Sequence, residues 1–131
     1  MIEFYLDGKA GVAPYLQLVQ QVKQAVRVGL LKPGDQLPTV REVVAGLAIN
    51  PNTVLKAYRE LEHARLVQGR PGQGTFIVGT IPGPPPGTYA RLRRGLRRWL
   101  DDAQAAGLDE ESIAAFVAST LRDALEGEEV A

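Results

Sequence analysis

The chain of 131 residues contains no cysteine, a single histidine, and equal numbers of acidic and basic residues, 15 of each. Without cysteine it cannot form disulfides or thiolate metal sites. A formal net charge of zero argues against a nonspecific architectural DNA-binding protein, because such a protein needs a strongly basic chain to neutralise phosphates. His63 has no carboxylate or thiol companion at ligand spacing, so we interpret it as a surface histidine.

Long hydrophobic runs and catalytic motifs are also missing. No stretch approaches the ~20 apolar residues that a membrane-spanning helix needs, and the N-terminal sequence MIEFYLDGKA does not resemble a signal peptide. We therefore expect a cytoplasmic protein without contact to a membrane. The sequence shows no phosphate loop, no nucleophile–base set and no paired carboxylates, so it predicts no enzyme activity, no cofactor and no metal site.

The most informative stretch covers residues 39–61 and predicts two short helices with a tight break between them. Thr39 and Glu42 have the spacing of a capping box, in which each side chain bonds the backbone N–H of the other residue. Asn50 is a favoured N-cap, and Pro51 takes the first helical position, where its missing N–H has no cost. This pattern predicts a helix-turn-helix.

The second helix of this pair has two different faces. Its predicted buried face consists of Val54, Ala57, Tyr58 and Leu61. Its N-terminal turns present short polar groups and one cation, namely Asn50, Asn52, Thr53 and Lys56. Such groups suit the edge of a DNA major groove. They also serve as helix caps, so an ordinary surface helix hairpin is an equally good interpretation of this stretch alone.

The flanking elements favour a DNA-binding fold. Residues 14–28 predict a preceding helix, and residues 2–6 predict a short strand or an ordered arm. After the helical pair, two β-prone runs at 66–69 and 75–78 enclose a Gly/Pro-rich tip that carries Arg70. Three helices followed by such a hairpin are typical of a winged helix-turn-helix. The predicted fold class is therefore mostly α with a small β-hairpin (α+β), with the winged helix-turn-helix at the N-terminus.

The rest of the chain predicts a second domain. We expect a DNA-binding domain at 1–79, a Pro/Gly-rich linker at 80–87 and a helical dimerisation domain at 88–131. Residues 1–79 hold nine Lys/Arg against six Asp/Glu, a net charge of +3, and residues 80–131 hold six against nine, a net charge of −3. Two helices of this length cannot bury both apolar stripes alone, so we expect a two-fold homodimer. The stripes are formed by Leu92, Leu96, Trp99, Leu100, Ile113, Phe116, Val117 and Leu121.

The sequence resembles the GntR family of bacterial transcription regulators, and in particular its short YtrA-type subfamily. The resemblance rests on the motifs PYxQ at 14–17, LxKPGDxLPTxRE at 30–42, NPNTV at 50–54, AYRELE at 57–62 and GxGTF at 72–76. It implies a repressor-type dimer on an operator with two-fold symmetry, often near a membrane-transporter operon. It also implies that any small-molecule effector, which the sequence does not identify, binds at the dimer interface or beside the linker.

The resemblance also implies roles for individual residues. It assigns DNA contact to Arg41, to the turn formed by Asn50, Pro51, Asn52 and Thr53, and to the wing-tip Gly72, with Arg70 beside it. From their positions alone, Thr39, Lys56 and Arg70 suit phosphate contacts. Arg41 has a second interpretation as an ion-pair partner of a nearby glutamate.

Two positions depart from the family pattern. Pro71 stands before the wing-tip glycine, where some relatives have histidine or a second basic residue. Leu55 replaces a residue that is polar in many relatives, so one DNA contact is absent there or Leu55 meets a thymine methyl group. The competing interpretation of the whole chain is a winged-helix protein-interaction module without specific DNA binding.

Overall fold

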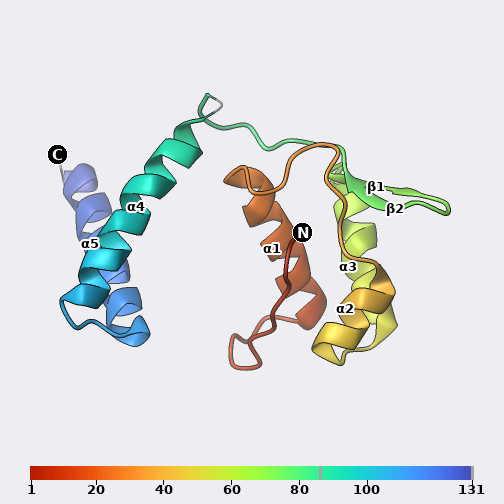
Figure 1. Cartoon of the computed structure of the whole chain (residues 1–131), viewed down its shortest axis with the longest axis horizontal. Helices are drawn as coiled ribbons and strands as arrows, with labels where there is room; N and C mark the ends of the chain where they lie inside the picture. The colour runs from red at the N-terminus through yellow and green to blue at the C-terminus, as the bar shows by residue number, and fades with distance from the viewer. Residues whose placement is uncertain (86, 131) are drawn as a thin grey trace. The chain divides into compact units, whose positions relative to one another are not determined.

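The computed structural model describes residues 1–85 and 87–130; Pro86 of the expected linker and the C-terminal Ala131 lie outside the described residues. Five helices and one two-stranded antiparallel sheet form in this part of the chain (Figure 1). In order they are α1 (Pro14–Arg27), α2 (Val40–Leu47), α3 (Pro51–His63), β1 (Val67–Arg70), β2 (Gly74–Ile77), α4 (Thr88–Ala105) and α5 (Glu110–Val130). The predicted fold class, mostly α with a small β-hairpin, is confirmed.

The chain divides into two compact units, Met1–Pro85 and Pro86–Ala131. The first contains α1 to β2, and the second contains α4 and α5. Ile81, which we had expected in the linker, packs against the core of the first unit. The ordered first unit therefore extends into the Pro/Gly-rich segment.

An N-terminal arm lies along α1 and resolves the choice between strand and arm at residues 2–6. The Tyr5 N–H donates to Gln21 Oε1 at 3.1 Å, and Gln21 Nε2 donates to the Tyr5 carbonyl at 2.8 Å. One turn earlier on α1, Gln17 pairs with the backbone of Asp7 in the same way, at 2.8 and 2.9 Å. Two side-chain amides thus take the place of a neighbouring strand. The apolar arm residues that pack against the core are Ile2, Phe4 and Leu6.

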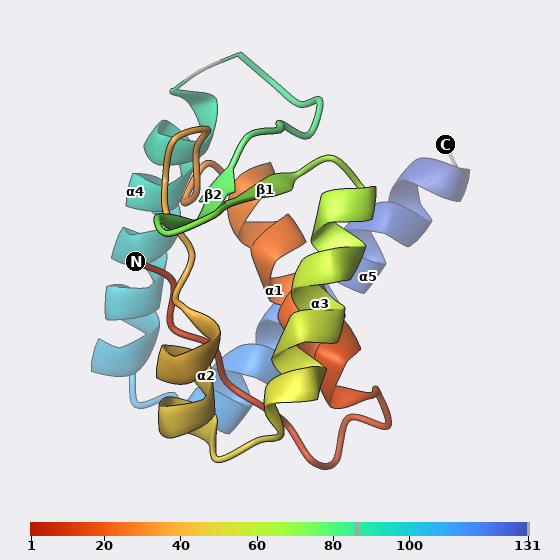
Figure 2. The ribbon, with the colours of Figure 1, turned by 90° about the vertical axis from the view of Figure 1, so that its right-hand side faces the viewer.

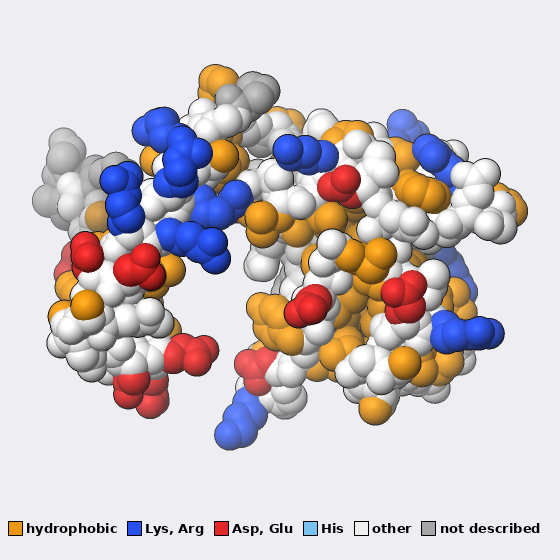
Figure 3. Space-filling model, viewed as in Figure 1, with side chains coloured by type: hydrophobic (Ala, Val, Ile, Leu, Met, Phe, Trp, Pro, Cys, Tyr) orange, Lys and Arg blue, Asp and Glu red, His pale blue; other side chains and the backbone are white. Residues whose placement is uncertain are grey.

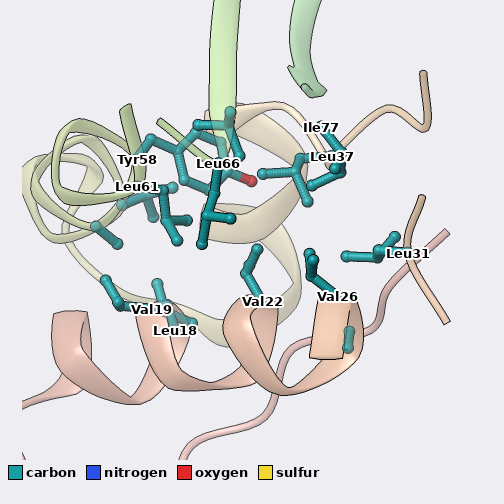
Figure 4. Close-up of a cluster of buried hydrophobic side chains, with 14 of the residues drawn as sticks. Leu18, Val19, Val22, Val26, Leu31, Leu37, Tyr58, Leu61, Leu66 and Ile77 are labelled. Carbon is teal, nitrogen blue, oxygen red and sulfur yellow. The ribbon is translucent and has the colours of Figure 1, made fainter. Parts of the chain in front are cut away.

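One hydrophobic core holds the first unit together. Side chains from α1, α3, the hairpin and the segment before α2 face one another in Figure 4. Those that are almost completely buried are Leu18, Val22, Leu37, Val54, Leu61 and Ile77. The hairpin joins this core because β1 and β2 pair from Val67 opposite Ile77 to Arg70 opposite Gly74, which places Ile77 inside. The core therefore determines where α3 and the hairpin stand.

The second unit is a helical pair with little buried surface. The Ser112 N–H donates to Asp109 Oδ1 at 2.8 Å, so Asp109 caps α5, and hydrogen bonds from Ser112 hold the pKa of Asp109 below its usual value. Among its described residues only Ala103 is a buried hydrophobic residue. Figure 3 shows Lys and Arg side chains gathered over the first half of α4 and acidic ones near its end. No described helix is long and apolar enough to cross a bilayer.

Candidate nucleic-acid interface

The first helix of the helix-turn-helix begins at the predicted capping box. The Glu42 N–H donates to Thr39 Oγ1 at 3.1 Å, and the Thr39 N–H and hydroxyl donate to Glu42 Oε1 at 3.3 and 3.0 Å. The Arg41 side chain is exposed and makes no hydrogen bond or ion pair with any residue that the structure describes. The alternative ion pair with a glutamate is therefore not formed here, and the Arg41 guanidinium is available to a partner.

A residue in the left-handed conformation closes the turn between the helices. Ala48 has φ 54° and ψ 45°, and its N–H bonds the Val44 carbonyl at 2.9 Å. Only residues 48–50 separate α2 from α3. For a residue with a Cβ atom this conformation costs roughly 1–2 kcal/mol, so the packing of the two helices has to maintain it. The turn sets the direction in which α3 leaves α2.

The second helix begins with a cap that keeps its first turn in place. The Asn52 N–H donates to Asn50 Oδ1 at 2.8 Å, and the Thr53 N–H donates to the Asn50 carbonyl at 3.0 Å. Pro51 occupies the first helical position, as predicted. Asn50, Pro51 and Asn52 are exposed and Thr53 is half-buried. An exposed helix N-terminus with polar side chains can bind an anionic backbone.

The inner face of α3 anchors the helix. The four residues predicted for this face are all buried. One of them, Tyr58, donates its hydroxyl to the Pro38 carbonyl at 2.5 Å, which ties α3 to the segment before α2. Burial, with a smaller effect of the Glu42 carboxylate, raises the pKa of the Tyr58 phenol well above its ordinary value of 10.0. Tyr58 therefore remains a neutral hydrogen-bond donor in neutral and mildly alkaline solution.

The outer face of α3 is exposed and largely polar. Its exposed residues are Pro51, Asn52, Leu55, Lys56, Arg59, Glu60, Glu62 and His63. The Lys56 ammonium lies 4.0 Å from the centre of the Tyr15 ring, which belongs to α1. Such a cation–π contact contributes only about 0.5–1 kcal/mol at an exposed site. It positions Lys56 beside the start of α1 and still permits a phosphate contact.

The hairpin forms a wing with a cationic side chain near its tip. Arg70 lies over the Phe76 ring of the paired strand, with Cζ 4.7 Å from the ring centre. Gly72 has φ +73°, and a Cβ atom added there would meet nothing within 4 Å. Glycine is therefore favoured at this position because of the positive φ, and not because a side chain would clash. The open tip leaves room for a partner to approach the backbone.

The residues that attach this wing were not among those predicted from the sequence. The Gly69 N–H donates to Glu62 Oε1 at 2.8 Å, which links β1 to the end of α3. Gln36 Nε2 donates to the Gln73 carbonyl at 3.2 Å, which links the wing to the segment before α2. These pairs are 7 and 37 residues apart, and no local pattern marks them. Both bonds orient the wing relative to the helix-turn-helix.

All predicted DNA-contact residues belong to the first unit. In Figure 1, α2 and α3 lie side by side and the β1–β2 hairpin projects away from the helices beyond α3; Figure 2 shows the same arrangement of α1, α2 and α3 after a quarter turn. The predicted dimerisation residues all lie on α4 and α5 of the second unit. Within the described residues no three His, Cys, Asp or Glu side chains group together so that they could hold a metal ion.

The fold and the geometry of this site define a class of protein. Three helices, the second and third joined by a tight turn, followed by a β-hairpin wing make a winged helix-turn-helix, whose exposed third helix is built to enter DNA. Residues 14–77 match the family model for bacterial regulatory proteins of the gntR family. The chain belongs to the GntR family of transcriptional regulators, and its helix-turn-helix is the DNA-binding element of that family.

Individual relatives agree with this assignment. The chain is 33% identical over 119 residues to the HTH-type transcriptional repressor YtrA of Bacillus subtilis, covering 90% of this chain and 92% of YtrA. It is 42% identical over 103 residues to the HTH-type transcriptional regulator Rv1152 of Mycobacterium tuberculosis, covering 79% and 81%. The solved structure of YtrA from Sulfolobus acidocaldarius, a GntR-family transcription factor, has 26% identity and a TM-score of 0.54, covering 78% and 97%. The resemblance predicted from sequence is confirmed.

Proposed function

We propose that this GntR-family regulator binds a two-fold symmetric operator as a homodimer and represses transcription. The observation that carries the proposal is the construction of α3. Its inner face is held in the core, its first turn is capped, and Asn52, Lys56 and Arg59 are exposed on its outer face. Two relatives with similarity over most of the chain are named as transcriptional regulators, and one of them as a repressor. The family resemblance further suggests a transporter operon as the target.

The side chains of the first unit divide into those that read bases and those that contact the backbone. Arg41 is unpaired and exposed, and a guanidinium suits the O6 and N7 atoms of guanine. Asn52 and Thr53 suit base edges at the start of α3. Asn50 and Pro51 orient that turn, and Gly72 lets the wing tip approach DNA. The proposed phosphate contacts are made by Thr39, Lys56 and Arg70.

The proposed dimer rests on the apolar face of α4 and α5. Trp99 and Phe116 pack at its centre with ring centres 5.9 Å apart, yet Trp99 remains 36% exposed. The other large side chains that remain exposed on these helices are Leu92, Leu96, Val117, Leu121 and Leu125. A contiguous apolar patch of this kind marks an interaction surface. A second copy of the same patch covers it with two-fold symmetry, which also presents two α3 helices to one operator.

The test is binding of the full-length protein to a duplex from its own upstream region and to a random duplex, at two salt concentrations. We expect tighter binding to the upstream duplex, with two chains per duplex. Arg41→Ala should weaken that binding by about 1–3 kcal/mol and relax the specificity. Arg27→Ala, which removes another exposed arginine, at the end of α1, is the matched control and should have little effect.

The other outcomes separate the alternatives. Equal and salt-sensitive binding to both duplexes would leave two options, an operator elsewhere or a ligand that is needed for specificity, and selection from a random-sequence library would separate them. No binding to any duplex at low salt would contradict the proposal and favour the protein-interaction module.

A further inference from the structure

Leu55 is an apolar residue on a surface that is otherwise polar. It is the one large hydrophobic side chain among the exposed residues of α3, with an exposed fraction of 40%, whereas the adjacent Val54 is fully buried. Leu55 belongs neither to the core nor to the half-buried residues that pack against it. Isolated exposed leucines are common on protein surfaces. A role for Leu55 therefore has to be argued from its position on α3.

Leu55 lies in the middle of the face that we propose for the major groove. It follows Asn52 by three residues and precedes Arg59 by four, with Lys56 next to it, and all four are exposed. Residues spaced by three or four are neighbours on one side of a helix. The groove-facing surface therefore contains polar and cationic groups with one apolar side chain between them.

The chemistry of the major groove offers one apolar partner. Each base pair presents hydrogen-bond donors and acceptors there, and thymine alone among the four bases adds a methyl group at C5. A leucine cannot donate or accept a hydrogen bond, so placing it against polar base edges would leave those groups desolvated and unpaired. We infer that Leu55 is a specificity-determining residue that contacts a thymine methyl in each half-site; this rests on the operator binding proposed above.

The spacing along α3 also predicts where this thymine lies. The Cβ atoms of residues three apart on a helix are about 5–6 Å from each other, and successive base pairs rise by about 3.4 Å. The thymine is therefore expected about one to two base pairs from the base that Asn52 reads. Because 5-methylcytosine carries its methyl group at the same place in the groove, Leu55 should prefer it to cytosine at this position.

The experiment starts from the full-length protein and a random-sequence duplex library, from which the bound sites are selected and sequenced. The selected site is then synthesised with single thymine-to-uracil replacements, which remove only the methyl group. We expect the replacement at one position to weaken binding about fourfold when it is made in a single half-site, and about 16-fold when it is made in both, as for one buried methyl group at each contact. Cytosine and 5-methylcytosine at that position should differ by a similar factor.

Variants of the protein connect this effect to Leu55. Leu55→Ala should bind the thymine and uracil duplexes equally, while Leu55→Met, which keeps an apolar side chain, should retain part of the discrimination. Leu30→Ala is the matched control, because Leu30 is an exposed leucine of the same unit that follows α1; it should discriminate as the wild type does. Thermal melting of each variant checks that it is folded.

Three outcomes would overturn the inference. If a symmetric site is selected but none of its thymine-to-uracil replacements changes the affinity, the role of Leu55 is disproved and operator binding still stands. Unchanged discrimination in Leu55→Ala would assign the methyl contact to another residue. Failure to select any site would contradict operator binding itself, and the role of Leu55 with it.

Discussion

The two units of this chain bury their apolar side chains to very different extents. Of the sixteen buried hydrophobic residues in the described parts of the chain, fifteen form the core of the first unit and one, Ala103, lies in the second. The first unit has three helices and a hairpin around that core, whereas the second has two helices joined by the Trp99–Phe116 ring contact. We therefore expect the first unit to contribute most of the folding free energy, and the apolar face of the second to favour a covering surface.

This difference explains why the two units suit different partners. The first half of the exposed face of α3 is mainly polar and carries Lys56, so it loses little when it meets a hydrated, anionic duplex. The exposed face of α4 and α5 is apolar, and its removal from water stabilises an assembly by roughly 25 cal/mol per Å². This contrast supports the proposal that the first unit binds DNA and the second a copy of the same chain.

The largest expected effect comes from the core of the first unit. Leu61→Ala removes a side chain that is 0% exposed and should reduce the free energy of unfolding by about 2–5 kcal/mol. Urea denaturation followed by circular dichroism measures this change. Leu121→Ala, on the exposed face of α5, is the matched control and should leave the unfolding of the first unit unchanged. Equal destabilisation by both would contradict the contrast between the units.

The next largest effect concerns the proposed dimer. Trp99→Ala removes the aromatic centre of the apolar face and should weaken dimerisation by about 2 kcal/mol or more, as for interface hot spots. Light scattering over a concentration series measures the dimer–monomer equilibrium. Arg94→Ala, an exposed residue of α4 outside the apolar stripe, should have no comparable effect. A wild-type protein that is monomeric at all concentrations would disprove the dimer.

A smaller effect is expected at the bond that joins α3 to the segment before α2. Tyr58→Phe removes the hydroxyl that donates to the Pro38 carbonyl and should cost about 1–2 kcal/mol of stability. The pKa of Tyr58 is raised in the folded state, so its contribution is complete below the ordinary pKa of 10.0 and is lost as the pH rises towards the folded value. Urea denaturation at neutral pH and above pH 10 should show a smaller alkaline loss for the variant than for the wild type.

The smallest expected effect is a gain in stability at the turn of the helix-turn-helix. Ala48→Gly relieves the left-handed conformation and should raise the unfolding free energy by about 0.5–1 kcal/mol, after the entropy of glycine in the unfolded chain is counted. The matched control is Ala45→Gly, an exposed helical position of α2, which should lower stability by a similar amount. Thermal melting shows whether each variant is more or less stable than the wild type. A loss of stability in Ala48→Gly would show that the backbone of Ala48 is not under strain.

Local features of the chain were predictable because they depend on neighbouring residues. The start of α2 follows from Thr39 and Glu42, three residues apart, and the start of α3 follows from Asn50 and Pro51. The periodicity of the apolar residues in α3 predicted its buried face without any knowledge of what would cover it. The order of helices and hairpin, with the family motifs, was sufficient to predict the winged helix-turn-helix.

Other features depend on how distant segments meet. Residues 2–6 have the composition of a strand, but in the structure they form an arm, in which Tyr5 pairs with the side-chain amide of Gln21 and the following Asp7 with that of Gln17. Lys56 lies over Tyr15, which is 41 positions earlier in the chain. The left-handed residue of the turn is Ala48, although Gly46 stands two positions before it within the helix. No local preference of these residues predicts any of the three contacts or conformations.

The sequence alone therefore determined the elements and the inner face of α3, because caps and periodicity act within a few residues, and the family motifs supplied the candidates for DNA contact. The tertiary structure decided which of those residues are free and how they are held. It left Arg41 unpaired, attached the wing through Glu62 and Gln36, and placed Leu55 in the open on α3. These outcomes depend on the angles at which the elements pack. The core sets those angles, and residues that are distant in the sequence can meet only once the elements have packed.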